Sequence, residues 1–400
     1  MIAVTSGMIG TYPVGGVVWD YGQYAVGLER LGFEVYYVED TALQTYDPTY
    51  RRYVDDPTYG VDFLRRSLPL LSETLARRWY FRSVDGRTYG MDNNRIRDVL
   101  ARADVFINVS GSCILRDEYM ACNRKVLIDT DPGWNHFRNY PRLDAQPEWG
   151  GGRGYRAHDY FFSYAENIGR EGCVLPSLGI SWEPTRAPVV PSMWRAQPPA
   201  ARWTTVLTWK NHPETIEYRG VRYGTKEMEF EKVETLPKLV PAALELAAGG
   251  TDRPEDEEQA KTWYPTRPRW EALGWSVVDS HAVSATAAAY RDYVQRSRGE
   301  FSVAKNVYVE TRSGWFSCRS VCYLAAGRPV VVQDTGFSDF LPVGGGLMAF
   351  SSLAEAAEAI KAVESDYARH AKMARDIAVE YFDAERVLGD MLSRCGLDAT

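Results

Sequence analysis

The chain opens with a strand, a glycine-rich loop, a helix and a second strand in direct succession, and this order constrains the fold more than any other feature. The apolar run at 2–5 is typical of a short buried strand, and a loop rich in glycine follows at 7–16. Apolar residues recur at helical spacing over 18–28, Gly32 ends that helix, and 34–38 forms the next strand. Such a βαβ unit is right-handed with parallel strands, so the sequence predicts an α/β fold.

The same alternation continues in the N-terminal half. Further strand candidates lie at 104–109, 125–129 and 160–164, with a helical pattern at 95–102. Residues 41–92, rich in Tyr, Arg and Pro, are expected to form an insertion that packs over the sheet. Within it, 80–89 predicts a hairpin that turns at Asp85-Gly86.

Prolines crowd the stretch 176–202, which has few periodic apolar residues and is typical of a linker. The alternation then resumes, with strand candidates at 204–208, 276–279, 301–304 and 329–332 and helices at 239–248, 285–296, 316–326, 353–363, 368–381 and 384–397. We therefore predict two α/β domains, residues 1–180 and 203–383, joined by a hinge at 181–202. Residues 384–400 follow as a C-terminal helix.

The composition argues against several classes of protein. Of 400 residues, 45% are hydrophobic, which is enough for each domain to bury its own core. There are 46 Lys and Arg against 53 Asp and Glu, so the net charge of −7 provides no global attraction to nucleic acid or anionic lipid. Apolar runs are far shorter than the roughly 18 residues that cross a bilayer, and no signal peptide is recognisable. We expect a cytoplasmic protein without a membrane span.

Cysteine, histidine and aromatic residues bear on the chemistry that the chain can perform. The six cysteines form no CxxC pair, and the five histidines occur in no HxxxH or HExxH arrangement, so neither a disulfide framework nor a metal centre is expected. The chain has 12 Trp and 25 Tyr. These residues either pack the core or line a pocket that stacks on planar or sugar-like ligands.

Open parallel sheets bind ligands outside the carboxyl ends of their strands, where the strand order reverses. Two such sheets joined by a hinge predict an interdomain cleft. The first loop lacks the GxGxxG pattern, which argues against a standard dinucleotide site. Gly15 and Gly16 either form a tight turn from strand to helix or let the backbone approach a substrate.

The densest signal lies at 305–336. A loop with Ser313, Gly314 and Trp315 opens a helix whose free N–H groups and positive dipole end would form an anion site. Charged and polar candidates flank it, namely Lys305, Arg319 and the run Asp334-Thr335-Gly336 at the end of the next strand. The two cations would neutralise a diphosphate. Alternatively, Ser313 is only an N-cap and Arg319 a surface cation.

The segment 327–336, GRPVVVQDTG, preceded by a helix that ends in YLAA, resembles the donor-binding segment of GT-B-type glycosyltransferases. The glycine loop with GLERLGFEV at 27–35 is similar to the opening of the same family, where the loop faces the acceptor. The resemblance is clearest over 1–40 and 203–340. It implies two Rossmann-like domains, a nucleotide-diphospho-sugar donor in the C-terminal domain, an acceptor in the N-terminal domain, no bound metal or cofactor, and a last helix that crosses back to the N-terminal domain.

The resemblance also bears on three single positions. Trp209 and Lys210 take the place of a basic loop that touches the donor phosphates, although Lys210 is alternatively a solvated surface residue. Many retaining members carry a glutamate that binds donor hydroxyls where this chain has Cys322. Equivalent contacts would then come from Arg319, Ser320, Asp334 or Glu300, and the stereochemical outcome is not carried over.

Transfer with inversion needs a base that deprotonates the acceptor hydroxyl. Asp131 is the first candidate, and Asp20, Asp129 and Glu166 are the others. Each has an ordinary alternative, since Asp20 suits the first turn of a helix, Asp129 and Asp131 a turn before Pro132-Gly133, and Glu166 a loop cap. Two aromatic side chains near the N-domain loops, Trp19 and Trp134, are candidates for stacking on the acceptor together with Gly15 and Gly16.

We therefore predict a metal-independent glycosyltransferase of the hexosyltransferase type, which moves a sugar from a nucleotide-diphospho-sugar to a hydroxyl of a small-molecule or saccharide acceptor in the interdomain cleft. One alternative is a GT-B-like nucleotide-sugar epimerase, which uses cleft acids and no acceptor. Another is a non-catalytic nucleotide- or sugar-binding protein, because Cys322 replaces the common glutamate. Nucleic acid is not an expected partner, since no basic stripe is visible.

Overall fold

The computed structural model describes residues 1–209, 215–249 and 266–398. Internal contacts divide the chain into two compact units. Unit 1 comprises Met1–Arg170, Leu175–Val190 and Asp383–Thr400, and unit 2 comprises Glu171–Val174 and Pro191–Phe382. Each unit is built around its own largely parallel sheet, so the predicted α/β class with two Rossmann-like domains is confirmed.

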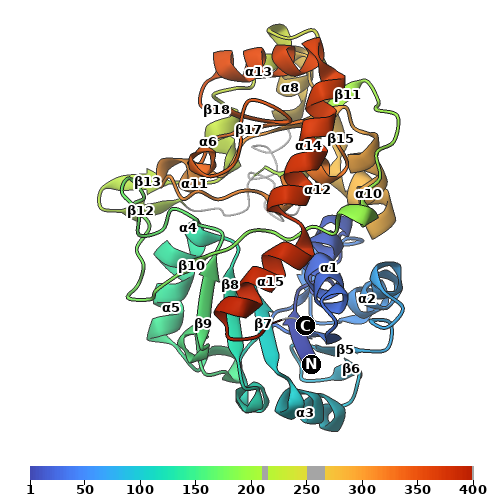
Figure 1. The fold of residues 1–400 in the computed structure, drawn as a ribbon, viewed down its shortest axis with the longest axis vertical. Coiled ribbons are helices and arrows are strands. Elements are labelled where there is room, and N and C mark those ends of the chain that lie inside the picture. Colours follow the sequence, from blue (N-terminus) through green and yellow to red (C-terminus); the bar gives the residue numbers. More distant parts are fainter. Residues whose placement is uncertain (210–214, 250–265, 399–400) are drawn as a thin grey trace. The chain divides into compact units, whose positions relative to one another are not determined.

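The sheet of unit 1 has the strand order β10-β9-β8-β7-β1-β2-β5-β6, and adjacent strands are parallel except β5 and β6 (Figure 1). The strands are β1 (Ile2–Ser6), β2 (Glu34–Asp40), β5 (Trp79–Arg82), β6 (Thr88–Gly90), β7 (Val105–Val109), β8 (Lys125–Asp129), β9 (Tyr160–Ser163) and β10 (Glu183–Pro184). Every residue of β7 and β8 is buried. Continuous burial is expected where helices cover both faces of a parallel sheet.

The helices of unit 1 are α1 (Gly15–Arg30), α2 (Thr58–Leu71), α3 (Asn93–Arg102), α4 (Pro132–Trp134), α5 (Tyr140–Ala145) and α15 (Ala384–Arg394). Helix α1 buries Val18, Tyr21, Ala25 and Leu28, the apolar positions that predicted it. The last helix, α15, packs against α1 (Figure 1). The end of the chain therefore belongs to the same unit as its beginning.

Gly27 lies at the contact between α1 and α15. A Cβ atom at Gly27 would lie 2.7 Å from Leu388 Cδ1 and 2.8 Å from Ala384 Cβ, whereas a Cβ atom at Gly389 would meet nothing within 4 Å. We expect Gly27→Ala to lower the free energy of unfolding by about 1–3 kcal/mol through overpacking. Gly389→Ala, the matched control, should raise it by about 0.5–1 kcal/mol because alanine favours the helix. Urea unfolding measures both, and equal stability of the two variants would contradict close packing at Gly27.

The sheet of unit 2 has the order β15-β14-β11-β16-β17-β18, and all its adjacent strands are parallel. The strands are β11 (Arg202–Thr208), β14 (Ala243–Gly249), β15 (Ser276–Asp279), β16 (Gly299–Ser302), β17 (Val330–Gln333) and β18 (Leu347–Phe350). The helices are α6 (Lys226–Phe230), α8 (Thr266–Leu273), α9 (Ser280–Ser284), α10 (Ala287–Arg296), α11 (Asn306–Glu310), α12 (Cys318–Ala325), α13 (Leu353–Ser365) and α14 (Tyr367–Tyr381). Two small antiparallel ribbons lie outside the sheets, β3 (Thr45–Asp47) with β4 (Arg52–Val54) in unit 1 and β12 (Ile216–Tyr218) with β13 (Val221–Tyr223) in unit 2.

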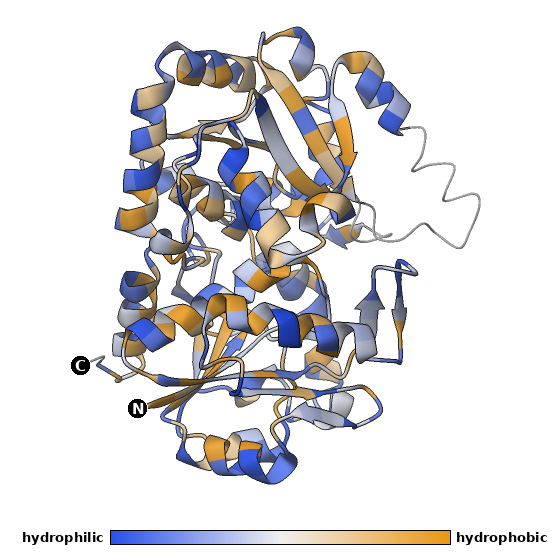
Figure 2. Ribbon diagram, turned by 90° about the vertical axis from the view of Figure 1, so that its right-hand side faces the viewer, coloured by the Kyte–Doolittle hydropathy of each residue, from blue (hydrophilic) through white to orange (hydrophobic). Residues whose placement is uncertain are grey.

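Aromatic side chains fill the core of unit 2. One buried cluster contains Trp203, Phe230, Trp270, Trp275, Phe301 and Phe350. The rings of Phe301 and Phe350 are stacked with their centroids 5.5 Å apart. The helices carry hydrophilic and hydrophobic residues along their length, as amphipathic helices packed against a sheet do (Figure 2). Core packing thus accounts for part of the high aromatic content.

The prediction of a helix at 239–248 is wrong, because strand β14 forms in this segment instead. Ala, Leu and Glu favour helix, but propensity is a weak prior that tertiary pairing overrides. Strand β14 pairs over its whole length with β11 and over four positions with β15, and it buries Leu244 and Leu246. An interior strand position thus satisfies the backbone on both sides.

The segment 41–92 does not simply pack over the sheet as predicted. Its strand β5 pairs in parallel with β2 and extends the sheet, and the hairpin at 80–89 forms by antiparallel pairing of β5 and β6. The proline-rich stretch contains only the two-residue strand β10 and a 3-10 turn at Pro191–Met193 among the described elements from 176 to 201. No helix in the part of the chain that the structure describes is both long and apolar enough to span a bilayer.

Candidate functional site

The strand order points to one ligand crevice in each unit. In unit 1, β1 is flanked by β2 and β7, and in unit 2, β11 is flanked by β14 and β16, so each first strand marks a reversal of strand order. Ligands bind at such points, outside the carboxyl ends of the strands. Pockets lie beside both, one at the end of β7 with Ser110 and the other at the end of β16 with Ser302.

The unit 2 pocket is a small depression at the N-terminus of α12. Its lining residues are Ser302, Val303, Ala304, Trp315, Phe316, Ser317, Arg319, Ser320, Val332, Gln333, Thr335 and Phe337. Four of them, Trp315, Arg319, Ser320 and Thr335, are predicted donor-binding residues. The tertiary structure therefore brings together residues that lie up to 20 positions apart, and it adds the ends of β16 and β17.

The N-terminus of α12 supplies hydrogen-bond donors to this pocket. Ser317, rather than Ser313, is the N-cap residue, and its Oγ accepts a hydrogen bond of 3.3 Å from the backbone N–H of Arg319. The first N–H groups of a helix have no intrahelical acceptor and carry a partial positive charge. The Ser320 hydroxyl is buried and has no hydrogen-bond partner among the described residues. These groups together favour an anion.

Arg319 is a largely buried cation, with 14% of its side chain exposed, and three hydrogen bonds hold it in place. Its Nε donates to Glu300 Oε1 at 2.6 Å, one Nη to the Val206 carbonyl at 2.7 Å and the other to Ser302 Oγ at 2.7 Å. Burial alone would lower the pKa of Arg319, but the charge of Glu300 and its hydrogen bond leave that pKa above the ordinary value. Arg319 is thus no surface cation, and two of its five N–H donors remain beyond these three bonds.

Lys226 is a residue that the sequence interpretation missed. This side chain on α6 is buried, and its amine has no hydrogen bond or ion pair within the described ranges. Burial and the neighbouring charges of Arg319 and Lys305 lower the pKa of Lys226 well below its usual value. The charge of Glu300 opposes this lowering only in part, and a buried amine without a hydrogen-bonding partner is unfavourable. The only indication of this residue in the sequence is a lysine that follows Gly224-Thr225, and this pattern is weak.

Glu229 fixes the helix that carries Lys226. Its buried carboxylate accepts from Asn306 Nδ2 at 2.7 Å, Gln333 Nε2 at 2.5 Å and Lys232 Nζ at 2.8 Å. Asn306 begins α11 and Gln333 ends β17, so Glu229 connects α6 to two segments beside the pocket. The sequence did not reveal this anchor, because its partners are 77 and 104 positions away.

The predicted loops around 313 and 335 hold each other in place. The Gly314 N–H donates to the Thr335 carbonyl at 2.8 Å, and Thr335 Oγ1 donates to the Trp315 carbonyl at 2.6 Å. Ser313 is buried, and its Oγ donates to the Tyr308 carbonyl at 3.3 Å. These residues build the wall of the pocket, and only Trp315 and Thr335 of them line it.

Asp334 and Gly336 shape the turn after β17. The Asp334 carboxylate accepts from the Gly336 N–H at 2.9 Å and from Ser338 Oγ at 2.6 Å. Gly336 has φ of 93°, in the left-handed region that favours glycine. The local hydrogen bonds of Asp334 thus serve the turn, and a contact of Asp334 with a donor stays a prediction.

The remaining donor candidates are placed differently. The Trp209 ring packs edge-on against Trp270 and Phe230 at centroid distances of 4.6 and 5.5 Å, so it joins the core. Lys305 precedes α11, and its amine lies 5.4 Å from the centroid of the Tyr308 ring. Lys210 lies outside the described residues.

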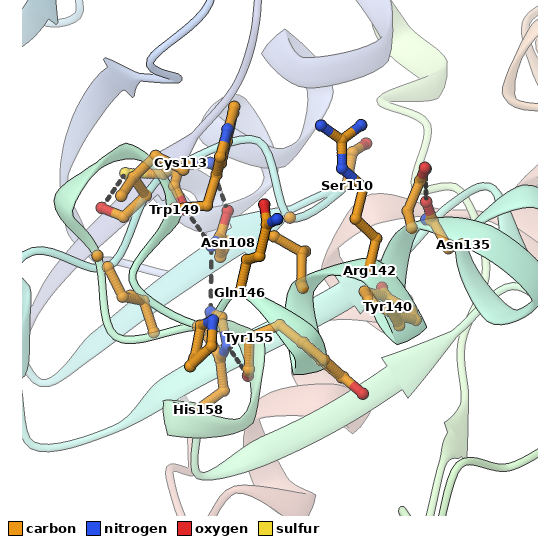
Figure 3. A pocket seen from close by; sticks show the side chains of 18 of the residues that line it. Asn108, Ser110, Cys113, Asn135, Tyr140, Arg142, Gln146, Trp149, Tyr155 and His158 are labelled. Carbon is orange, nitrogen blue, oxygen red and sulfur yellow. Dashed lines mark hydrogen bonds between the residues drawn. The ribbon is translucent and has the colours of Figure 1, made fainter.

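The unit 1 pocket is larger, with a cavity of about 360 Å³. Figure 3 shows side chains from the segment 139–158 and from the loop after β7 around it. At its base, Asn108 Nδ2 lies 3.1 Å from His158 Nε2, and His158 Nδ1 lies 2.6 Å from the Tyr155 carbonyl. Burial lowers the pKa of His158 to about 4, so His158 is neutral at physiological pH and belongs to the base of the pocket.

Asp131, the first candidate base, lies next to this pocket in the chain. Thr130 Oγ1 is 2.6 Å from Ser110 Oγ, and the Asn135 N–H donates to the Asp131 carbonyl at 3.1 Å; Ser110 and Asn135 both line the pocket. Asp129, in contrast, is fully buried and accepts from Asn135, His136 and Ser163. Of the two, Asp131 is the partly exposed carboxylate.

The other N-domain candidates have different surroundings. Glu166 forms a bidentate ion pair with Arg186 at 2.5 and 2.9 Å, and burial raises its pKa although Arg186 opposes this. Gly15 is the first residue of α1, and Gly16 and Asp20 follow it in the first two turns. Trp19 and Trp134 are both buried, with 1% of each residue exposed. Their roles at an acceptor stay predictions.

Among the described residues, no three His, Cys, Asp or Glu side chains are grouped as a metal ion would require. All six cysteines are free thiols, and Cys322, which replaces the family glutamate, is buried and donates to the Cys318 carbonyl at 3.3 Å. Independence from metal stays a prediction about the reaction.

Comparisons place this architecture among known structures. No protein-family model and no curated protein matches the chain. AviGT4, a glycosyltransferase involved in avilamycin A biosynthesis, matches with a TM-score of 0.53 and 12% identity over 98% of this chain and 97% of its own. HepE from Anabaena, in complex with UDP and glucose, matches with a TM-score of 0.57 and 10% identity over 98% and 100%. Sucrose-phosphate synthase from Thermosynechococcus elongatus matches with a TM-score of 0.51 and 10% identity over 99% of both chains. The similarity thus extends over both units.

Proposed function

We propose that this chain, which has the GT-B fold, transfers a sugar from a nucleotide-diphospho-sugar to an acceptor hydroxyl. The observation that carries the proposal is the donor cluster at the N-terminus of α12, which consists of Arg319, the unpartnered Ser320 hydroxyl and the free N–H groups of the helix. The buried amine of Lys226 interacts with Arg319 through its charge. A diphosphate offers the acceptor oxygens that these donors would bind. HepE, a protein of the same fold, was solved with UDP-glucose, which supports a nucleotide sugar as the donor.

The cluster would act on the leaving group. When the bond between the sugar and the diphosphate breaks, negative charge builds up on the departing phosphate oxygen. Arg319 and the free N–H groups of α12 lie at one pocket, and the Lys226 amine interacts with Arg319 through its charge, so these groups would stabilise the negative charge. The Ser320 hydroxyl provides a further donor.

We place the acceptor in the unit 1 pocket and assign Asp131 as the base that takes the proton from its hydroxyl. We expect Asp131→Asn to abolish sugar transfer while nucleotide binding stays intact, because the amide cannot accept the proton but keeps the shape of the side chain. A transfer assay with a melting-temperature titration of the nucleotide separates the two effects. Glu166→Gln is the control, since Arg186 already engages that carboxylate. Full transfer by the Asp131 variant would exclude this role.

Melting temperatures of the purified chain with UDP, GDP, dTDP, ADP, CMP and NAD test the proposed function. A nucleotide that binds only the folded state raises the melting temperature. We expect a rise with one nucleoside diphosphate, followed by release of that diphosphate from its sugar conjugate when an acceptor is added. A rise with NAD alone, or none at all, would refute nucleotide-sugar transfer. An altered sugar conjugate without diphosphate release would indicate an epimerase.

A further inference from the structure

The unit 1 pocket has an unbalanced charge. Its lining residues include the amides Asn108, Asn135, Asn139 and Gln146, one exposed arginine, Arg142, and no Asp or Glu. The Arg142 guanidinium has no hydrogen bond or ion pair in the described part of the chain, and His158 at the base is neutral. The residues that line the pocket therefore carry one positive charge and no negative one, and Asp131 lies next to the pocket rather than in its lining.

The neighbouring arginines do not share this property. Arg116 donates to both carboxylate oxygens of Asp40 at 2.8 and 2.9 Å. Arg153 pairs with Asp117 at 2.6 Å, and Arg156 forms a bidentate pair with Asp144 at 2.6 and 2.8 Å. Arg142 is thus distinguished from other cations of this region by its place in a cavity and by its lack of a carboxylate.

An aromatic ring stands at the rim of the same pocket. Trp149 is 38% exposed, whereas most tryptophans of the chain are buried. Its loop is fastened, because Arg116 Nη1 donates to the Gly150 carbonyl at 2.7 Å and the Arg153 N–H donates to the Leu115 carbonyl at 2.9 Å. Figure 3 shows Trp149, Gln146 and Arg142 along one side of the pocket. A held indole face is suited to stacking on a sugar ring.

We infer that this pocket selects a saccharide or glycoside that carries a carboxylate or phosphate group. Arg142 binds the anionic group, Trp149 stacks on the ring, and Asn139 and Gln146 bind hydroxyls. The size of the cavity, about 360 Å³, falls in the range of small-molecule sites. That this ligand is the acceptor rests on the proposed function, but its binding does not require transfer.

Titration calorimetry with three probes tests the inference. The probes are methyl glucuronide, glucose 6-phosphate and the neutral methyl glucoside, measured while the nucleoside diphosphate that raises the melting temperature saturates the other site. We expect at least one anionic probe to bind at least about tenfold more tightly than methyl glucoside, in line with a charge-assisted hydrogen bond. Arg142→Gln should remove this preference, and Trp149→Ala should weaken the binding of every probe that the wild-type protein binds.

Arg97→Gln is the matched control, because Arg97 is an exposed arginine on α3 that does not line the pocket. It should leave the preference unchanged. Equal binding of charged and neutral probes, a preference that survives Arg142→Gln, or no binding of any probe at millimolar concentration would overturn the inference. If no probe binds while the nucleotide still does, only the inference about this pocket is refuted. Selective binding of an anionic probe without transfer from any nucleotide sugar refutes the proposed function alone.

Discussion

Replacing Lys226 by methionine is expected to slow sugar transfer by about 10²- to 10³-fold without lowering the melting temperature. The loss follows because the amine would stabilise the charge that develops on the leaving diphosphate. Stability is retained because a buried amine without a partner is unfavourable, and methionine fills a similar volume without charge. Initial rates with the donor identified by the melting screen, together with calorimetric unfolding, measure both effects.

Lys238→Met is the matched control, since Lys238 is an exposed lysine of the same unit and lies outside the pocket. Its transfer rate should be unchanged. If Lys226→Met kept the wild-type rate, Lys226 would have no place in the donor site. If the variant were less stable instead, the Lys226 amine would have a hydrogen-bonding partner in the folded protein that the structure does not contain.

The lowered pKa of Lys226 also makes nucleotide binding depend on protons. A bound diphosphate raises the pKa that burial and Arg319 lower, so the amine takes up a proton at any pH between its free and bound pKa values. Binding therefore weakens as the pH rises from the free pKa to the bound pKa, and it becomes independent of this amine above the bound pKa. Calorimetric binding enthalpies in two buffers of different ionisation enthalpy detect this uptake, at a pH where the nucleotide phosphates are fully ionised. The Lys226→Met variant should show none.

Arg319→Ala is expected to lower the free energy of unfolding by about 3–5 kcal/mol. The substitution leaves Glu300 as an unpaired carboxylate that is fully buried. It also removes the hydrogen bonds that Arg319 donates to the Val206 carbonyl and to Ser302. Urea unfolding measures the loss. For this reason a missing nucleotide response in Arg319→Ala would say little about binding unless the variant is shown to be folded.

The double variant Arg319→Met/Glu300→Leu separates charge from packing. Replacing a buried ion pair by apolar residues of similar volume is often neutral or stabilising, so the double variant should regain most of the stability. Arg202→Ala is the control, since Arg202 pairs with Glu245 but is half exposed, and it should change stability by less than about 1 kcal/mol. An Arg319→Ala variant of near wild-type stability would show that solvent reaches Glu300.

Much of the architecture follows from local patterns. The βαβ opening, the hairpin at 80–89, and helices α10 and α12–α15 are recognisable because their apolar spacing and turn residues agree with the tertiary structure. The prediction of a helix in place of strand β14 was wrong because its residues favour helix. Only pairing with the two neighbouring strands, β11 and β15, makes this segment a strand. Strand β18 was missed for a related reason, because four residues are too few to show a period.

The sequence by itself determined the α/β class, the resemblance to GT-B glycosyltransferases and the segment 313–336 around α12. Local chemistry suffices for these features, since caps, glycine turns and apolar periods act over a few residues. The tertiary structure alone decided that Ser317 caps α12, that Lys226 is buried and interacts with the charge of Arg319, and that Arg142 lines a pocket without a carboxylate. Charge balance and burial depend on partners that lie far away in the chain, and no local pattern encodes them.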